Sequence, residues 1–170
     1  MRLFLVASTG LLVLTALGAE PAVPADDAAS LKVVKYPELT RTVRDLQGKV
    51  VVVDFWADWC INCKREFPHL VEMQKKYAKD GLVAVSVTVD KADDEEAVGR
   101  ARKFLRSAHA DFTNLLLDEP DSVWGEKLSA KTIPLIFVFG RDGRLAGKFD
   151  GEDANYEKKI EPFVADLLNK

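Results

Sequence analysis

The sequence predicts an α/β fold built as one domain. Its 170 residues are 48% hydrophobic and 30% charged, which suits a single globular core rather than a disordered chain. From Leu31 onward the apolar residues switch repeatedly between strand spacing and helix spacing, without an internal repeat. The formal net charge of -3 provides no basic field for a polyanion. We therefore expect no nucleic-acid partner.

The N-terminal region has the pattern of a targeting segment. One positive side chain is followed by an uncharged apolar stretch, which as a helix over residues 3–17 would reach about 22 Å, less than the roughly 30 Å hydrocarbon core of a membrane. We predict a signal peptide over residues 1–19 and export to the periplasm or another extracytoplasmic compartment. The alternative is an uncleaved N-terminal membrane anchor. Residues 20–30, rich in Ala, Pro and Asp, read as a linker before a folded domain over 31–170.

The first half of this domain alternates short strands with helices. Residues 31–35 can form a strand, and Pro37 suits the first turn of a helix that Gly48 ends. Residues 50–56 are almost continuously apolar, which is typical of a central strand covered on both faces. The alternation continues with a helix over 61–79 and a buried strand over 82–89.

The second half is predicted to add a helix, a short strand, a hairpin and a closing helix. Asp93 and Glu96 have the spacing of a capping box, which predicts a helix that begins there and reaches about Ser107. The remaining elements are a strand over 115–117, a helix over 122–128, a hairpin over 135–149 and an amphipathic helix over 155–168.

The chemistry is concentrated in the two cysteines, Cys60 and Cys63, which a buried strand delivers to the start of a helix. A thiol at a helix N-terminus faces unpaired N–H groups and the positive end of the helix dipole, which stabilise the thiolate. Cys60 is therefore the predicted nucleophile. Cys63 follows about one turn later, within reach of a mixed disulfide on Cys60, and is the predicted resolving thiol.

Metal binding is the other use that a cysteine pair can have. A zinc site normally needs four ligands, and His69 and His109 complete no familiar cluster with the cysteines, so we expect no metal site. Binding of Cu(I) by the dithiol remains an alternative of a different class, because soft thiolates suit that ion. Otherwise the only redox group expected is the Cys60–Cys63 disulfide/dithiol itself, without a further cofactor.

The residues around the cysteines resemble a known family. The run Trp-Cys-Ile-Asn-Cys-Lys at 59–64, with Asp54 upstream and Thr-Ile-Pro at 132–134, resembles the thioredoxin superfamily. The run from Cys63 to Pro68, and the extra segment at about 92–118, are more similar to its extracytoplasmic TlpA/ResA-like branch of thiol:disulfide oxidoreductases. The resemblance implies a thioredoxin fold, with a central mixed β-sheet flanked by helices and an inserted helix-strand segment at about 92–118.

The resemblance also implies an activity and a substrate groove. It points to an enzyme that reduces protein disulfides, with a disulfide oxidase or isomerase as the alternative. Pro134 matches the cis-proline that faces the two cysteines, and Ile133 would offer backbone hydrogen bonds to an extended substrate strand. Trp59 should lie at the edge of the reactive groove. Because a dithiol in an oxidising compartment must be kept reduced, a membrane electron-transfer protein is the expected reductant.

Two acidic residues are candidates for proton transfer. Asp54 lies in an otherwise apolar strand, so burial should raise the pKa of its carboxyl group. The superfamily uses this residue as proton acceptor or donor for the second cysteine, here Cys63. Glu66 matches the acid that TlpA/ResA-like proteins place beside the active site, and both candidates stay open. Ser86 stands where thioredoxins often have a lysine beside the aspartate, which leaves Asp54 without that charged partner.

Overall fold

The computed structural model describes residues 30–170 of the chain. The predicted signal peptide over 1–19 and all but the last residue of the predicted linker lie outside the described residues. Within residues 30–170, no helix combines the length and the apolar character that crossing a membrane requires.

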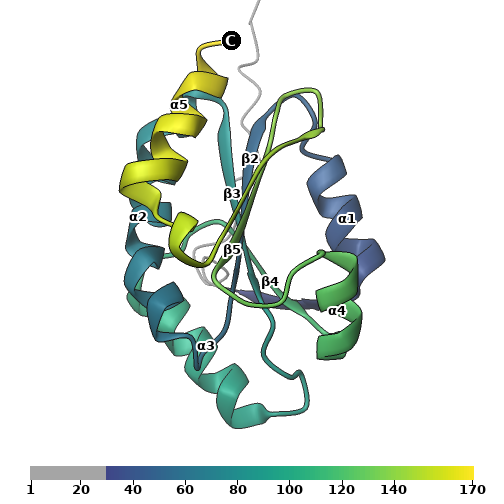
Figure 1. Ribbon diagram of the computed structural model, residues 1–170. Helices are drawn as coiled ribbons and strands as arrows, with labels where there is room; N and C mark the ends of the chain where they lie inside the picture. The colour runs from purple at the N-terminus through teal and green to yellow at the C-terminus, as the bar shows by residue number, and fades with distance from the viewer. Residues whose placement is uncertain (1–29) are drawn as a thin grey trace, which may run out of the picture.

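Six strands form one mixed sheet in the order β1-β4-β3-β2-β5-β6 (Figure 1). Neighbouring strands from β1 to β2 are parallel, whereas β5 and β6 pair antiparallel at the other side of the sheet. The strands are β1 (Leu31–Val34), β2 (Val50–Trp56), β3 (Leu82–Thr88), β4 (Thr113–Leu117), β5 (Leu135–Phe139) and β6 (Leu145–Asp150). This sheet confirms the fold class predicted from the sequence.

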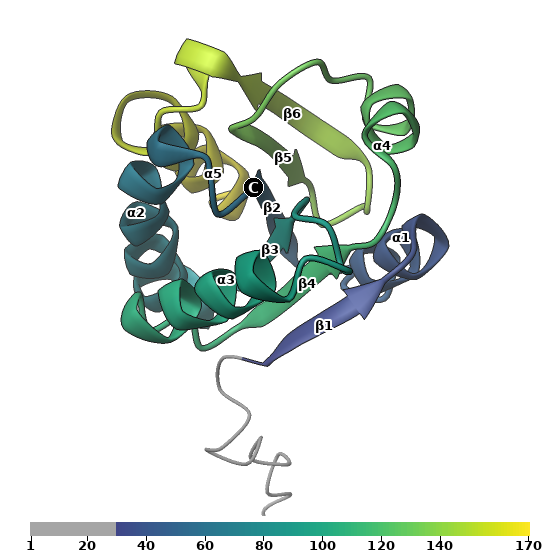
Figure 2. The same cartoon turned by 90° about the horizontal axis from the view of Figure 1, so that it is seen from below.

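Helices cover both faces of the sheet. Figures 1 and 2 show α2, α3 and α5 on one face and α1 and α4 on the other. The helices are α1 (Tyr36–Arg44), α2 (Ile61–Tyr77), α3 (Glu95–Ser107), α4 (Asp121–Lys127) and α5 (Glu161–Leu168). The segment expected as an insertion at about 92–118 forms α3 and β4, and β4 lies between β1 and β3.

Two helix starts differ from the sequence predictions. The capping box of Asp93 and Glu96 is wrong: Asp94 precedes α3, and its Oδ1 accepts the backbone N–H of Ala97 at 2.9 Å. Asp94 is the residue with the non-helical backbone that turns a side chain back onto the first turn. The closing helix predicted from Asn155 is divided into a π-helical segment, Tyr156–Ile160, and α5.

The strand that leads to the cysteines is enclosed on both sides. All residues of β2 are buried, as expected for a strand with helices on both faces. At its end, Phe67 from α2 packs against Trp56 and against Phe104 of α3, with ring centroids 5.5 Å and 5.1 Å away, and these two rings also contact each other. These contacts hold the helix that begins at the cysteines, and the inserted helix α3, against the same end of the sheet.

Candidate active site

The two cysteines form a disulfide at the N-terminus of α2, with their Cα atoms 5.3 Å apart. Cys60 occupies the cap position in extended backbone, and its Sγ accepts the backbone N–H of Cys63 at 3.2 Å. The cap position thus places the Cys60 sulfur among the unpaired N–H groups of the first turn. Cys60 is 7% exposed and Cys63 only 1%, so Cys60 is the half of the pair that a partner reaches first.

Two large apolar side chains flank Cys60 in the chain and project into solvent. Trp59 is 67% exposed and Ile61 is 80% exposed, although both belong to residue types that are usually buried. They present exposed apolar surface on both sides of Cys60 in the chain, and Trp59 also lines a hollow with Ile133.

The predicted proline loop comes to the same place. The Ile133–Pro134 peptide bond is cis, and the two residues line a groove of about 330 Å³ together with Asn62 and Glu66 from the start of α2. The far wall of the groove is the 151–155 segment, whose Gly151 N–H donates a hydrogen bond to the Pro134 carbonyl at 3.3 Å.

A second hollow also borders this loop. It is lined by Ile133 together with Trp59 and Arg100. The groove and the second hollow therefore share Ile133, and both border the cysteine segment. The predicted substrate-binding residues, Trp59, Ile133 and Pro134, are brought together by the fold although more than 70 residues separate the first from the others.

Asp54 is a buried acid with one hydrogen-bond partner. It is 2% exposed in β2, and its Oδ2 accepts the hydroxyl of Tyr156 at 2.8 Å, whereas Oδ1 is buried without a partner among residues 30–170. Burial raises the pKa of Asp54 to about 7, against the opposing effect of the Tyr156 hydrogen bond. The negative charge of Glu66 adds to the increase.

Glu66 belongs to the same cluster. Its side chain is 16% exposed, and its Oε2 lies 3.5 Å from the backbone nitrogen of Tyr156, which donates to it. Its Oε1 lies 3.7 Å from Nε of Arg65. Both predicted acids are thus in the site, joined through Tyr156. Ser86 pairs with Asp54 in register, but its hydroxyl donates to Asn114 instead.

Sequence reasoning missed Tyr156. The residue falls at the start of an amphipathic helix, where a tyrosine normally signals only packing, and it contacts a strand about 100 residues earlier. Its backbone N–H and its hydroxyl donate to two different carboxyl groups, those of Glu66 and Asp54. No local pattern announces such a contact.

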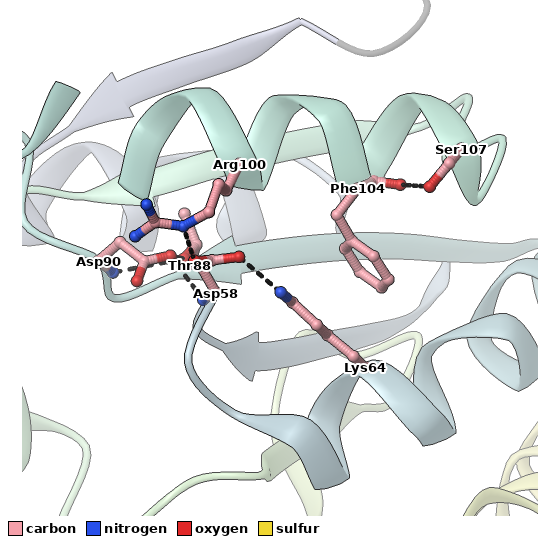
Figure 3. A network of polar contacts seen from close by, with 7 residues as sticks. All are labelled: Asp58, Lys64, Thr88, Asp90, Arg100, Phe104 and Ser107. Carbon is pink, nitrogen blue, oxygen red and sulfur yellow. Dashed lines mark hydrogen bonds and ion pairs between the residues drawn. The ribbon is translucent and has the colours of Figure 1, made fainter. Parts of the chain in front are cut away.

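A polar network holds the loop that precedes Cys60 (Figure 3). The carboxylate of Asp58 accepts hydrogen bonds from Lys64 on α2 and from Arg100 on α3, each at 2.5 Å. Burial alone would raise the pKa of Asp58, but the bonds from Arg100 and Lys64 outweigh it and hold that pKa below its usual value. The ammonium of Lys64 also lies 5.5 Å from the ring centroid of Phe104.

The backbone of the same loop is held from β3. The N–H of Asp58 donates to Oδ2 of Asp90 at 2.8 Å, and the Thr88 hydroxyl donates to the same oxygen. Burial raises the pKa of Asp90 in spite of these two hydrogen bonds. Figure 3 shows Asp58 between Lys64 and Arg100, so the loop is attached to α2, α3 and the end of β3 at once.

The described part of the chain offers no group of three or more His, Cys, Asp or Glu side chains arranged to hold a metal ion. Of the acids of the site, Asp54 lies in β2, whereas Glu66 lies on α2 after the two cysteines. The arrangement can carry out thiol chemistry: an accessible sulfur at a helix N-terminus, an enclosed second sulfur, and a carboxyl group whose pKa lies near neutrality.

Comparison with known proteins agrees with this chemistry. The AhpC/TSA family profile matches residues 24–148. Thiol-disulfide oxidoreductase ResA of Bacillus cereus is 29% identical over 125 residues, which cover 71% of this chain and 68% of the relative. A solved structure of a putative thiol:disulfide interchange protein DsbE from Chlorobium tepidum superimposes with a TM-score of 0.63 at 29% identity, over 74% of this chain and 84% of that one.

A third similarity involves a much larger protein. Protein SUPPRESSOR OF QUENCHING 1 of Arabidopsis thaliana, described as chloroplastic, is 30% identical over 125 residues. The match covers 74% of this chain but only 12% of the length of the plant protein. It therefore concerns one region of that protein and not its whole activity.

Proposed function

The chain belongs to the AhpC/TSA family of the thioredoxin superfamily and is a thiol-disulfide oxidoreductase, and we propose that it reduces the disulfides of other proteins outside the cytoplasm. The observation that carries this proposal is the Cys60–Cys63 pair at the N-terminus of α2, with one sulfur near the surface and the other enclosed. The cysteine pair holds the two electrons that the reaction needs, so we propose no metal and no organic cofactor.

In the first step the Cys60 thiolate attacks a disulfide of the substrate protein. A bond forms between Cys60 and one substrate sulfur, and the other substrate sulfur leaves as a thiolate that takes up a proton. The position of Cys60 at the helix cap supports this role, since the first-turn N–H groups stabilise the thiolate.

In the second step Cys63 resolves the mixed disulfide. Its thiol loses a proton to an acceptor and attacks the Cys60 sulfur, which forms the intramolecular disulfide and releases the second substrate thiol. Asp54 and Glu66 are the candidate acceptors, and the pKa of Asp54, at about 7, suits proton uptake at neutral pH. An acceptor for the enclosed thiol favours rapid release of the reduced substrate.

The substrate is proposed to bind over Cys60, at the N-terminus of α2. The exposed side chain of Trp59 would pack on apolar parts of the substrate, while the backbone of Ile133, next to Pro134, would pair with an extended strand. Ile133 borders both hollows beside the proline loop, and Trp59 borders one of them. An unfolded or loop segment that carries a disulfide fits such a site better than a disulfide in a buried core.

The proposed compartment rests on the apolar N-terminal pattern. A reductant in an oxidising compartment needs a supply of electrons, and we propose a membrane electron-transfer protein with its own cysteine pair as that source. The test is N-terminal sequencing of the protein from the periplasm of a bacterium that expresses the full chain. A protein found with an intact N-terminus in the cytoplasm would contradict the proposed location.

The reaction itself is tested with single cysteine variants. Reduction of insulin disulfides should be lost in Cys60→Ser, whereas Cys63→Ser should accumulate a mixed disulfide with insulin that non-reducing electrophoresis detects. Insulin reduction that continues at the normal rate in Cys60→Ser would show that the assigned nucleophile is wrong.

The direction of the reaction is tested by the reduction potential of the Cys60–Cys63 couple, measured in defined thiol buffers through tryptophan fluorescence. A value at or below about -230 mV supports a reductant, and a value above about -150 mV supports an oxidase or isomerase. Absence of a reversible couple would instead favour binding of Cu(I) by the dithiol.

A further inference from the structure

We infer that Tyr156 is a positioning residue of the thiol chemistry, which holds Asp54 as the group that takes the proton from Cys63 during resolution. The inference deepens the proposed function and rests on it. It takes Asp54 in the role that the superfamily gives this residue, and it assigns a new positioning role to Tyr156, a residue of the C-terminal segment that no sequence motif indicated.

Tyr156 and Asp54 form a buried hydrogen bond. The Tyr156 hydroxyl donates to Oδ2 of Asp54 at 2.8 Å, and both residues are almost fully buried, at 1% and 2% exposure. A hydrogen bond to a charged acceptor is stronger than one between neutral groups, so the contact fixes the carboxyl in one orientation. The other oxygen, Oδ1, is buried without a partner among the described protein groups. One oxygen of Asp54 is held, and the other is free to accept a proton.

Glu66 and Asp54 differ in the contacts that their carboxylate oxygens make. Both oxygens of Glu66 have neighbours, the backbone N–H of Tyr156 at Oε2 and the guanidinium of Arg65 at Oε1. Among residues 30–170, the one hydrogen-bond donor to Asp54 is the Tyr156 hydroxyl, and burial raises the pKa of Asp54 to about 7. Asp54 is therefore the better acceptor at neutral pH.

Tyr156 itself stays a hydrogen-bond donor throughout. Burial and the nearby charge of Asp54 raise the pKa of its phenol well above the usual value, so it does not ionise in the working range. It donates while Asp54 is charged. A neutral Asp54 is also able to accept from it, so the contact persists on both sides of the proton transfer.

The position of Cys63 brings it to this cluster. Cys63 and Glu66 are three residues apart on α2, on one side of the helix, and Cys63 is 1% exposed. Glu66 contacts Tyr156, and Tyr156 contacts Asp54, so the buried side of the first turn of α2 meets the end of β2 through these residues. The titratable groups that act on Asp54 are Tyr156 from the C-terminal segment and Glu66 from α2.

Resolution of the mixed disulfide moves one proton and two electrons. In the mixed disulfide, the Cys63 thiol gives its proton to Oδ1 of Asp54, and the Cys63 sulfur bonds to the Cys60 sulfur. The bond between Cys60 and the substrate breaks, and the substrate leaves as a thiolate that is protonated from solvent. The enzyme dithiol is oxidised to the disulfide, the substrate is reduced, and the proton on Asp54 later returns to solvent.

The test uses the reduced protein and Ellman's reagent. Attack by Cys60 releases one thionitrobenzoate in a phase that depends on reagent concentration. Attack by Cys63 then releases a second in a concentration-independent phase, which reports resolution alone. In the unaltered protein the rate of this second phase should rise with pH, with a midpoint near 7, because Asp54 must be ionised to accept the proton.

Tyr156→Phe removes the donor and keeps the ring. Because the lost hydrogen bond stabilised the charged carboxylate, the midpoint should move upward by about one pH unit, and resolution at pH 7 should slow about fivefold. Tyr77→Phe is the matched control, since its hydroxyl bonds to Glu161 away from the cysteines, and its midpoint should not move. An unchanged midpoint in Tyr156→Phe would overturn the inference.

Two acid variants identify the acceptor. Asp54→Asn should abolish the pH-dependent rise, and adding Tyr156→Phe to it should change nothing further. Glu66→Gln should keep the rise. The reverse pattern, with the rise lost in Glu66→Gln and kept in Asp54→Asn, would show that Glu66 takes the proton and that the inference is wrong.

A fluorinated residue covers the case in which Tyr156→Phe does not fold. Incorporation of 3-fluorotyrosine at position 156 makes the phenol a stronger donor and should move the midpoint downward, opposite to Tyr156→Phe. A midpoint that stays in place would overturn the inference. If the first phase is missing in the unaltered protein, Cys60 is not a nucleophile and the proposed function fails, which is a distinct result.

Discussion

The guanidinium of Arg100, on the inserted helix α3, donates a hydrogen bond from its Nε to Oδ2 of Asp58 at 2.5 Å, two residues before Cys60. This hydrogen bond attaches the inserted segment, through α3, to the loop that precedes the nucleophile Cys60. Lys64 binds the other oxygen of the same carboxylate. Two cations thus compensate the negative charge nearest to Cys60 in the chain.

Arg100→Gln should slow alkylation of Cys60 by iodoacetamide about threefold at pH 7 and low salt. With one cation removed, the charge of Asp58 disfavours the thiolate, and half a unit in thiol pKa is a threefold change in thiolate. The difference should shrink at high salt, since Arg100 is exposed. Arg102→Gln, on the exposed side of the same helix, should leave the rate unchanged. Equal rates for the two variants would contradict a role of the Asp58 network in Cys60 reactivity.

Asp54→Asn should stabilise the oxidised protein above neutral pH. The pKa of Asp54 is about 7 in the folded protein and about 3.8 when exposed, so the folded state binds a proton more tightly than the unfolded state. The contribution of Asp54 to the free energy of unfolding is largest below pH 4, decreases as the pH rises to about 7, and stays low at higher pH. At 1.36 kcal/mol per pKa unit, the gain in Asp54→Asn at pH 8 is at most about 4 kcal/mol.

Urea denaturation of the oxidised protein at pH 5 and pH 8 measures this effect. The advantage of Asp54→Asn over the unaltered protein should be larger at pH 8. Asp111→Asn, at an exposed position, is the control and should show the same small difference at both values. An advantage that does not depend on pH would mean that Asp54 is not a buried acid with a raised pKa.

Trp59→Ala should impair the reaction with protein substrates and spare small disulfides. The side chain is 67% exposed, so its removal should change the free energy of unfolding by no more than about 0.5 kcal/mol. If it packs on a substrate segment, kcat/KM for insulin should fall about tenfold, as for an interface residue worth 1–2 kcal/mol. The rate with Ellman's reagent should change less than twofold. Leu145→Ala, another exposed apolar side chain, is the control for both substrates.

Phe67→Ala should cost about 3–5 kcal/mol of folding stability. The ring is fully buried against Trp56 and Phe104, where β2, α2 and α3 meet. Phe163→Ala is the comparison, because that ring is only partly buried against Phe149 and its loss should cost less. Thermal and urea denaturation measure both losses. If Phe67→Ala and Phe163→Ala lost the same stability, the central position of Phe67 in the core would be contradicted.

Much of the site followed from local patterns in the sequence. The apolar run that forms β2 predicted a strand covered on both faces, and the position of Cys60 and Cys63 directly after it predicted a thiol at a helix cap. The acid within that run, Asp54, was expected to be buried with a raised pKa, and it is. These features depend on residues within about ten positions of one another, where spacing alone specifies strand, turn and helix.

The start of α3 shows the limit of such patterns. Four acidic residues occur together over 93–96, and several of them have an acceptable spacing for a helix cap. Asp94 is the cap because its non-helical backbone directly precedes Glu95, and its side chain accepts the N–H of Ala97. The choice depends on how the preceding turn from β3 directs the chain, which composition does not encode.

The sequence by itself determined the alternation of elements, the redox pair and the buried acid, because hydrophobic period and helix capping act between near neighbours. Only the tertiary structure decided which groups surround them. Tyr156 reaches Asp54, and Arg100 reaches Asp58, across 102 and 42 residues of chain. Such contacts arise when helices pack on the two faces of the sheet, and the packing of many side chains at once, rather than any local pattern, fixes which polar groups meet.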